Sequence, residues 1–137
     1  MKSLEHAALG AVSGAVAVFV LFPSLGLLDK GLLWVGGVLL SVFIDLDHFV
    51  IARWMEGNWS NLRRAVSDPR VGLVDQEEVF AGTNEPMLRQ YRLLSHLLLG
   101  GVLVLASASV DSALALLVSL LLYVHVVADL IRDTELA

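Results

Sequence analysis

The chain of 137 residues has the length of one compact domain. Hydrophobic residues make up 57% of it and charged residues only 17%, with a mean hydropathy of +0.77, a composition typical of a membrane protein rather than of a soluble domain. A net charge of −5 argues against direct binding of nucleic acid, and the lack of cysteine excludes disulfides, thiolate nucleophiles and cysteine-held zinc.

Four apolar runs are each long enough to cross a hydrocarbon core of about 30 Å as a helix. We therefore predict an all-α fold, a four-transmembrane-helix bundle that forms a single integral membrane domain over residues 1–137. The predicted spans cover about 6–27, 31–53, 87–110 and 112–132. The polar stretch 54–86 between the second and third spans is predicted to be a loop, and Asn84-Glu85-Pro86 at its end resembles a helix start.

Positive charges are divided unevenly between the two sides of the membrane. Four crossings place both termini and the loop 54–86 on one side, and that side carries every lysine and arginine except Lys30: Lys2, Arg53, Arg63, Arg64, Arg70, Arg89, Arg92 and Arg132. The positive-inside rule makes this side cytoplasmic. We expect a multi-pass protein of the cell (inner or plasma) membrane with both termini and the loop in the cytoplasm.

The chemically active side chains of the spans gather at the same side. All four histidines and the aspartates nearest to them lie at span ends that the alternation of directions brings to the cytoplasmic face: His6, Asp45, Asp47, His48, His96, His125 and Asp129. Asp45 and His48 have i, i+3 spacing, and His125 and Asp129 have i, i+4 spacing, so each pair shares a helix face. Small residues such as Gly10 and Gly100 continue these faces into the membrane and let helices approach closely.

Clustered carboxylates and imidazoles near a membrane need partners. An unpaired aspartate at mid-span costs roughly 2.5–3.5 kcal/mol, and a divalent cation would stabilise the cluster. Imidazole with carboxylate oxygen suits zinc, manganese or iron better than calcium. Without a metal, Asp45 and Asp47 could instead pair with Arg53 or Arg92, and His125 could hydrogen-bond an aspartate to clamp two helices.

The order of these motifs resembles the membrane-bound metal-dependent hydrolase family of the YdjM type, also described as LexA-binding inner-membrane-associated hydrolases. Four segments carry the resemblance along nearly the whole chain: His6 with Gly10, Asp45–His48, Tyr91–Leu97 and His125–Asp129. The chain departs from the family pattern in the third segment, where Tyr91 replaces a histidine and Leu97 replaces a serine.

This resemblance implies a membrane-embedded hydrolase that uses one or two divalent metal ions, zinc first with manganese or iron open, on phosphoester or lipid-type substrates. The expected metal ligands are His6, Asp45, His48, His96, His125 and Asp129. Asp47 is expected to be a bridging ligand or general base, and Arg92 to neutralise negative charge that develops on an anionic substrate. The expected partners are membrane lipid and that substrate, and the small helix faces leave a homo-oligomer open. The alternative is a non-catalytic multi-pass protein whose cluster is structural or metal-binding and whose loop recruits a partner.

Overall fold

The computed structural model of the chain describes residues 3–73 and 76–134, and every element within those ranges is helical. Four helices are long and apolar enough to cross a membrane: Ser3–Leu21, Leu27–Glu56, Glu85–Ala108 and Ser112–Asp133. The all-α prediction is therefore confirmed, and the chain has the features of a membrane protein. Lys2, which was counted on the cytoplasmic side, and residues 74–75 of the predicted loop lie outside the described residues.

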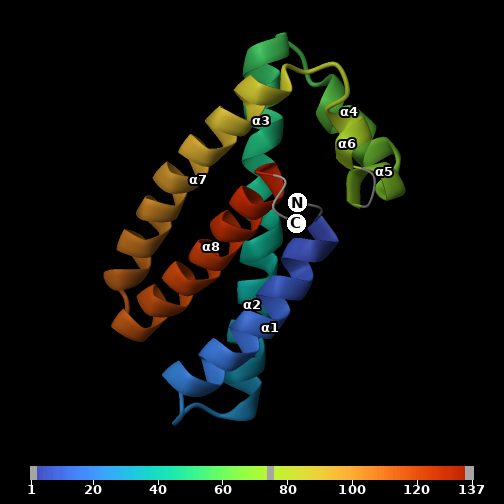
Figure 1. Cartoon of the computed structure of the whole chain (residues 1–137). Coiled ribbons are helices and arrows are strands. Elements are labelled where there is room, and N and C mark those ends of the chain that lie inside the picture. The colour runs from blue at the N-terminus through green and yellow to red at the C-terminus, as the bar shows by residue number, and fades with distance from the viewer. Residues whose placement is uncertain (1–2, 74–75, 135–137) are drawn as a thin grey trace.

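The helices follow one another with short connections (Figure 1). In chain order they are α1 (Ser3–Leu21), α2 (Leu27–Phe43), the 3₁₀ turn η1 (Ile44–Leu46), α3 (Asp47–Glu56), α4 (Ser60–Ser67), α5 (Pro69–Leu73), α6 (Gln76–Val79), α7 (Glu85–Ala108) and α8 (Ser112–Asp133). Figure 1 shows α2, η1 and α3 as one long rod. Helix α1 packs beside α2, and α8 packs against α1, α2 and α7.

Small residues allow α1 and α2 to cross closely. Gly10 of α1 faces Ser41 of α2, and a Cβ atom at Gly10 would lie only 2.5 Å from Ser41 Oγ. Beside that crossing, the Trp34 indole Nε1 donates a hydrogen bond to the carbonyl oxygen of Ala11, the residue after Gly10, at 2.8 Å. The predicted role of Gly10 in close helix approach therefore matches its position.

The apolar core lies between α1, α2 and α8, on the side of this crossing that is away from His6. Ala17 and Val18 of α1 pack with Leu117 and Leu121 of α8, and all four side chains are buried. Gly37 of α2 makes room for Leu121, because a Cβ atom at Gly37 would lie 2.8 Å from Leu121 Cδ1. Most other large apolar side chains of the four spans are exposed, as expected for helices that face lipid.

Side-chain caps define where α7 and α8 begin. The Asn84 side chain accepts a hydrogen bond from the Met87 backbone N–H at 3.2 Å, with Pro86 in the first turn, so the helix start predicted here is found. Asp111 likewise accepts from the Leu114 N–H at 2.8 Å. The short turn before α8 makes α7 and α8 antiparallel neighbours that pack along each other.

The polar stretch predicted as a loop contains three short helices, α4 to α6. The Glu56 carboxylate, at the end of α3, accepts hydrogen bonds from Ser60, Asn61 and Thr83, so both ends of the stretch are fastened to α3. The Phe80 ring, which follows α6, packs edge-on against the His48 ring of α3, with 6.2 Å between ring centroids. The segment α4–α6 thus belongs to the end of the bundle that carries the histidines.

Candidate metal centre

All four spans bring ligand-type side chains to one end of the bundle. The residues come from α1, η1, α3, α7 and α8, which confirms the convergence expected from the alternation of span directions. Five of the six side chains expected as ligands are buried, with these exposed fractions: His6 1%, His125 2%, His96 3%, Asp129 4% and Asp45 8%. His48, the sixth, is partly exposed.

One group of four residues forms an enclosed cluster, here called the inner group: His6, Asp45, His125 and Asp129. His6 Nε2 lies 3.2 Å from Asp129 Oδ1 and 3.5 Å from Asp45 Oδ2. His125 Nε2 lies 3.4 Å from Asp129 Oδ2 and 3.3 Å from Asp45 Oδ1. Two imidazoles and two carboxylates therefore alternate around a common centre, and the two histidine rings stack with centroids 3.8 Å apart.

A second group, here called the outer group, consists of Asp45, His48 and His96. Asp45 Oδ1 lies 3.3 Å from His48 Nε2 and 3.1 Å from His96 Nε2. Asp45 belongs to both groups, and the Nε2 atoms of His96 and His125 are 3.1 Å apart across the boundary. The two groups consequently form one continuous cluster with Asp45 at its middle.

The local backbone explains the central place of Asp45. The second span tightens into the 3₁₀ turn η1 at Ile44–Leu46, and residues three apart eclipse each other in 3₁₀ geometry. Asp45 and His48 are three apart, so the turn helps to direct both side chains into the same space. A 3₁₀ turn within a long helix often marks a functional position.

Backbone carbonyls orient two of the histidine rings. The Nδ1–H of His125 donates to the Ser41 carbonyl oxygen at 2.9 Å, and the Nδ1–H of His96 donates to the Arg92 carbonyl oxygen at 2.8 Å. In these tautomers each Nε2 keeps a lone pair that faces the cluster. A histidine that ligates a metal is commonly fixed in this way through its other ring nitrogen.

Asp47 lies beside the cluster rather than in either group. It accepts a hydrogen bond from the Ser95 hydroxyl, and its Oδ2 is 3.2 Å from His96 Nδ1. Its other oxygen, Oδ1, is 3.5 Å from His48 Nε2 and has no hydrogen-bond donor among the described residues. The structure thus places Asp47 next to the outer group, between α3 and α7.

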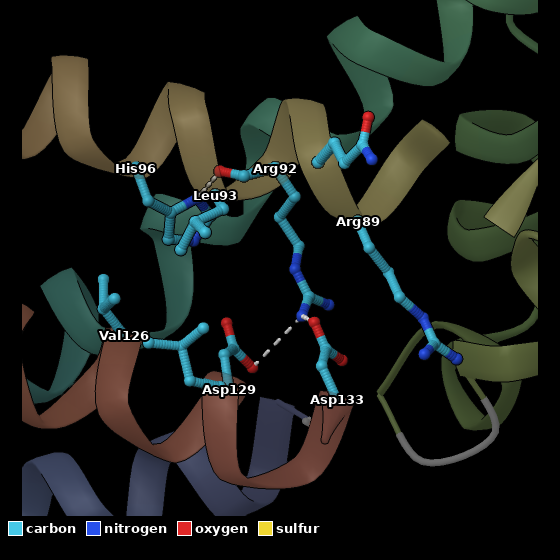
Figure 2. A pocket seen from close by; sticks show the side chains of 9 residues that line it. Arg89, Arg92, Leu93, His96, Val126, Asp129 and Asp133 are labelled. Atoms are coloured by element: carbon cyan, nitrogen blue, oxygen red, sulfur yellow. Dashed lines mark hydrogen bonds and ion pairs between the residues drawn. The ribbon is translucent and has the colours of Figure 1, made fainter. Parts of the chain in front are cut away.

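Arg92 forms the edge of the cluster on the side of α7. Its guanidinium donates to Asp133 Oδ2 at 2.5 Å and lies 3.8 Å from Asp129 Oδ1, as Figure 2 shows. The guanidinium therefore pairs with two aspartates of α8, not with Asp45 or Asp47. A cavity of about 160 Å³ between α7 and α8 reaches this point, and His96 and Asp129 are part of its wall.

The polar atoms of the cluster form a donor set that can hold a metal ion, and some of them also hydrogen-bond one another, as His96 Nε2 does with Asp45 Oδ1 at 3.1 Å. Among the described residues, no hydrogen-bond partner reaches the buried Nε2 atoms of His6 and His48, although carboxylate oxygens face both. Buried polar groups normally have hydrogen bonds, so atoms without them call for another partner. Neutral imidazole nitrogen with carboxylate oxygen is a donor set that binds divalent transition metals, and this buried His/Asp cluster can hold a metal ion.

Several features of the centre were not expected from the sequence. Asp133 was missed as the partner of Arg92, although it follows Asp129 by one helical turn. The carbonyl of Ser41 was missed because a backbone acceptor leaves no signature in the residue type. Tyr91, which replaces a histidine of the pattern that the sequence resembles, packs its ring edge-on against Trp54 at 5.1 Å between ring centroids and belongs to neither ligand group.

No protein-family model, curated protein or solved structure matches the chain. The functional conclusion therefore depends on the residues and on their geometry. Those establish four helices able to span a membrane and, at one end of them, a buried cluster able to hold a metal ion.

Proposed function

We propose that this protein is a membrane-embedded metal-dependent hydrolase of phosphoester or lipid-type substrates, with its His/Asp centre at the cytoplasmic face. The ordered motifs that resemble the YdjM-type family support this activity. The placement of nearly all lysines and arginines on the side of the centre supports the cytoplasmic orientation.

The sharing of Asp45 between two ligand groups is the observation that carries the proposal. A centre of two ions would use the inner group to hold one ion and the outer group to hold the other, with Asp45 belonging to both groups. Sites with two metals about 3.5–4 Å apart recur in enzymes that cleave phosphoesters. Asp45 would thus serve both groups, whereas Asp47 remains available as a general base.

Separations between the ligand atoms of the inner group match a tetrahedral ion such as zinc. Bonds of about 2.0–2.2 Å around a tetrahedral ion place the ligand atoms about 3.3–3.6 Å from one another. The four nitrogen–oxygen separations of the inner group range from 3.2 to 3.5 Å. Hydrogen bonds from a ring N–H to oxygen are usually about 2.7–3.2 Å long, so most of these separations suit zinc ligation better than hydrogen bonding.

The two groups differ in a way that suits structural and catalytic positions. The inner group supplies four buried ligands, and closed four-ligand sites are typical of structural zinc. The outer group supplies three ligands, one of them partly exposed, and catalytic zinc sites typically have three protein ligands with one position open. We therefore assign the chemistry to the outer group, at Asp45, His48 and His96.

The residues around the outer group have distinct tasks. When bound, a divalent ion supplies Lewis acidity, which polarises an ester oxygen and makes water a better nucleophile. The unpartnered oxygen of Asp47 accepts the proton from the attacking water, and Ser95 holds the carboxylate in place. Arg92 faces the cavity and neutralises negative charge on the reacting group.

The burial of the inner group favours a second candidate function. Four ligands from α1, η1 and α8 would fasten these helices together, so the metal could serve the fold without turnover. In that case the segment α4–α6 recruits a partner. This candidate predicts bound metal and no hydrolysis.

Elemental analysis of the protein purified in detergent tests the metal centre. We expect two zinc ions per chain in the wild type, one in His48→Ala, one in His125→Ala and nearly none in Asp45→Asn. Asp111→Asn is the matched control, since it removes a carboxylate at the opposite end of the bundle while asparagine still caps α8. A wild-type protein without metal would reject both candidate functions.

A turnover screen then separates the two candidates. Phosphodiester and phospholipid substrates are offered to zinc-loaded protein, and Asp47→Asn and Arg92→Gln are compared with the wild type. The hydrolase proposal expects turnover that both substitutions abolish while the zinc content stays at the wild-type level. Stoichiometric zinc without hydrolysis of any substrate would favour the structural candidate.

A further inference from the structure

We propose that the centre takes its substrate from the bilayer through the cavity between α7 and α8, and that Arg89 recognises a phosphate headgroup there. The inference rests on the proposed hydrolase function and adds an amphiphilic substrate class and a specificity residue. Arg89 does not belong to the ligand groups or to the expected catalytic residues.

The cavity joins the centre to the outside of the bundle. Its wall includes His96 and Asp129, one from each ligand group, and also Arg89 near the start of α7. The volume of about 160 Å³ equals about five water molecules at ~30 Å³ each, which is room for a phosphate group but not for acyl chains. A lipid bound here would therefore have its chains outside the cavity.

Apolar side chains line the remaining wall. Leu93 of α7 lines the cavity together with Val126 and Leu130 of α8. Leu130 is itself exposed, and the exposed Leu97 follows Leu93 by one turn toward the middle of the span. The exposed Leu97 and Leu130 continue this apolar surface outside the cavity, where the acyl chains of a bound lipid would contact it.

Two arginines, Arg89 and Arg92, line the cavity and can receive an anion there. Figure 2 shows Arg89 and Arg92 extending from α7 toward α8. Arg92 is held by Asp133, whereas Arg89 pairs with the exposed Glu85 at 3.6 Å. Exposed ion pairs are worth little, so the Arg89 guanidinium can exchange Glu85 for a phosphate at low cost. Arginine binds phosphate through paired N–H donors, which makes such contacts strong.

Aromatic rings lie on the opposite side of the centre. Phe80 packs edge-on against His48 and lies against Phe49 with 5.5 Å between ring centroids. The cavity between α7 and α8 instead has Arg89, His96 and Asp129 in its wall, so it offers a route past Arg89 to the ligands.

Binding measurements with three probes test the headgroup and the chains separately. The probes are dioctanoyl phosphatidic acid, dioctanoylglycerol, which lacks the phosphate, and glycerol phosphate, which lacks the chains. We expect phosphatidic acid to bind zinc-loaded protein in detergent at least about tenfold more tightly than either other probe. Similar affinity for dioctanoylglycerol would refute phosphate recognition, and similar affinity for glycerol phosphate would refute access from the bilayer.

Matched variants locate the site. Arg89→Gln should weaken phosphatidic acid binding at least about tenfold, because it removes a charge-assisted contact. Arg63→Gln, an exposed arginine on α4, should leave it unchanged. Leu93→Trp should block the cavity, whereas Leu97→Trp one turn away should not. Equal effects within either pair would overturn the proposal.

Turnover and zinc content are scored in the same samples, so that the two proposals fail in different ways. Arg89-dependent lipid binding without hydrolysis would support the lipid site and count against the hydrolase. Hydrolysis of phosphoesters with unchanged kinetics in Arg89→Gln would support the hydrolase and count against the lipid site.

Discussion

The substitution Gly10→Ala should weaken the metal centre although Gly10 is not a ligand. An alanine Cβ here would lie 2.7 Å from Ser41 Cβ, and ordinary contacts begin at 3.4 Å, so the helices must separate by about 0.7 Å. Gly10 lies one turn from His6, and the Ser41 carbonyl holds His125. Metal–ligand distances tolerate deviations of about 0.2 Å, so a shift of this size reaches the inner group.

The size of the effect follows from the cost of overpacking. Inserting one methyl group into a close contact costs about 1–3 kcal/mol. If the helices relieve that strain by withdrawing His6 and His125 from the ion, zinc affinity falls by the corresponding factor of about 5- to 150-fold. Competition with a chromophoric chelator, in detergent, measures the affinity directly.

Two further variants make the test specific. Gly14→Ala lies one turn along the same helix, where the new Cβ would meet Leu121 and Trp34 at an ordinary 3.6 Å, so zinc affinity should not change. The double variant Gly10→Ala with Ser41→Gly removes the clashing side chain and keeps the carbonyl, so affinity should return. Wild-type affinity in Gly10→Ala, or no rescue in the double variant, would refute the mechanical link between the crossing and the centre.

Three other changes probe the surroundings of the centre. Tyr91→Phe should leave zinc content unchanged, since the ring packs against Trp54; loss of zinc would instead assign the phenol oxygen to the centre. Ser95→Ala should lower turnover by about 10- to 100-fold at unchanged zinc content, because the Asp47 carboxylate loses the hydroxyl that holds it, and unchanged turnover would remove Ser95 from that role. Chelation of the metal should lower the thermal unfolding temperature in detergent, since a ligand at 100 times its Kd stabilises the fold by about 2.7 kcal/mol; an unchanged temperature would show that the metal does not bind the folded state preferentially.

Most of the architecture follows from the apolar runs. Their lengths predict four long helices, and the alternation of direction places the end of the second and the start of the third at the same end of the bundle. The convergence of His6, His48, His96 and His125 is a consequence of that alternation, although only His6 lies at the end of its span in the structure, whereas His96 lies midway along α7 because this helix begins before the apolar run. Long-range proximity was predictable here because membrane spans leave few alternative arrangements.

The contacts of individual residues within the cluster could not be predicted in the same way. Spacing indicates that Asp45 and His48 share a face, but the place of Asp45 in both groups depends on η1, and nothing in the residue types signals a 3₁₀ turn. The pairing of Arg92 with Asp133 depends on the register between α7 and α8. Hydrophobic patterns define which helices are adjacent, whereas a register is fixed by side-chain packing.

Because the centre lies between helices, binding of the proposed metal ion is coupled to how tightly those helices pack. In lipid, apolar side chains gain little by turning inward, so helices associate through packing, polar contacts and close approach of small residues. In this chain the buried apolar core is small and lies between α1, α2 and α8, whereas α7 reaches the cluster through His96 and contacts α8 and α3. Removal of the metal should therefore loosen α7 more than α1. Since the cavity lies between α7 and α8, the same loosening would widen the route by which a substrate reaches the ligands.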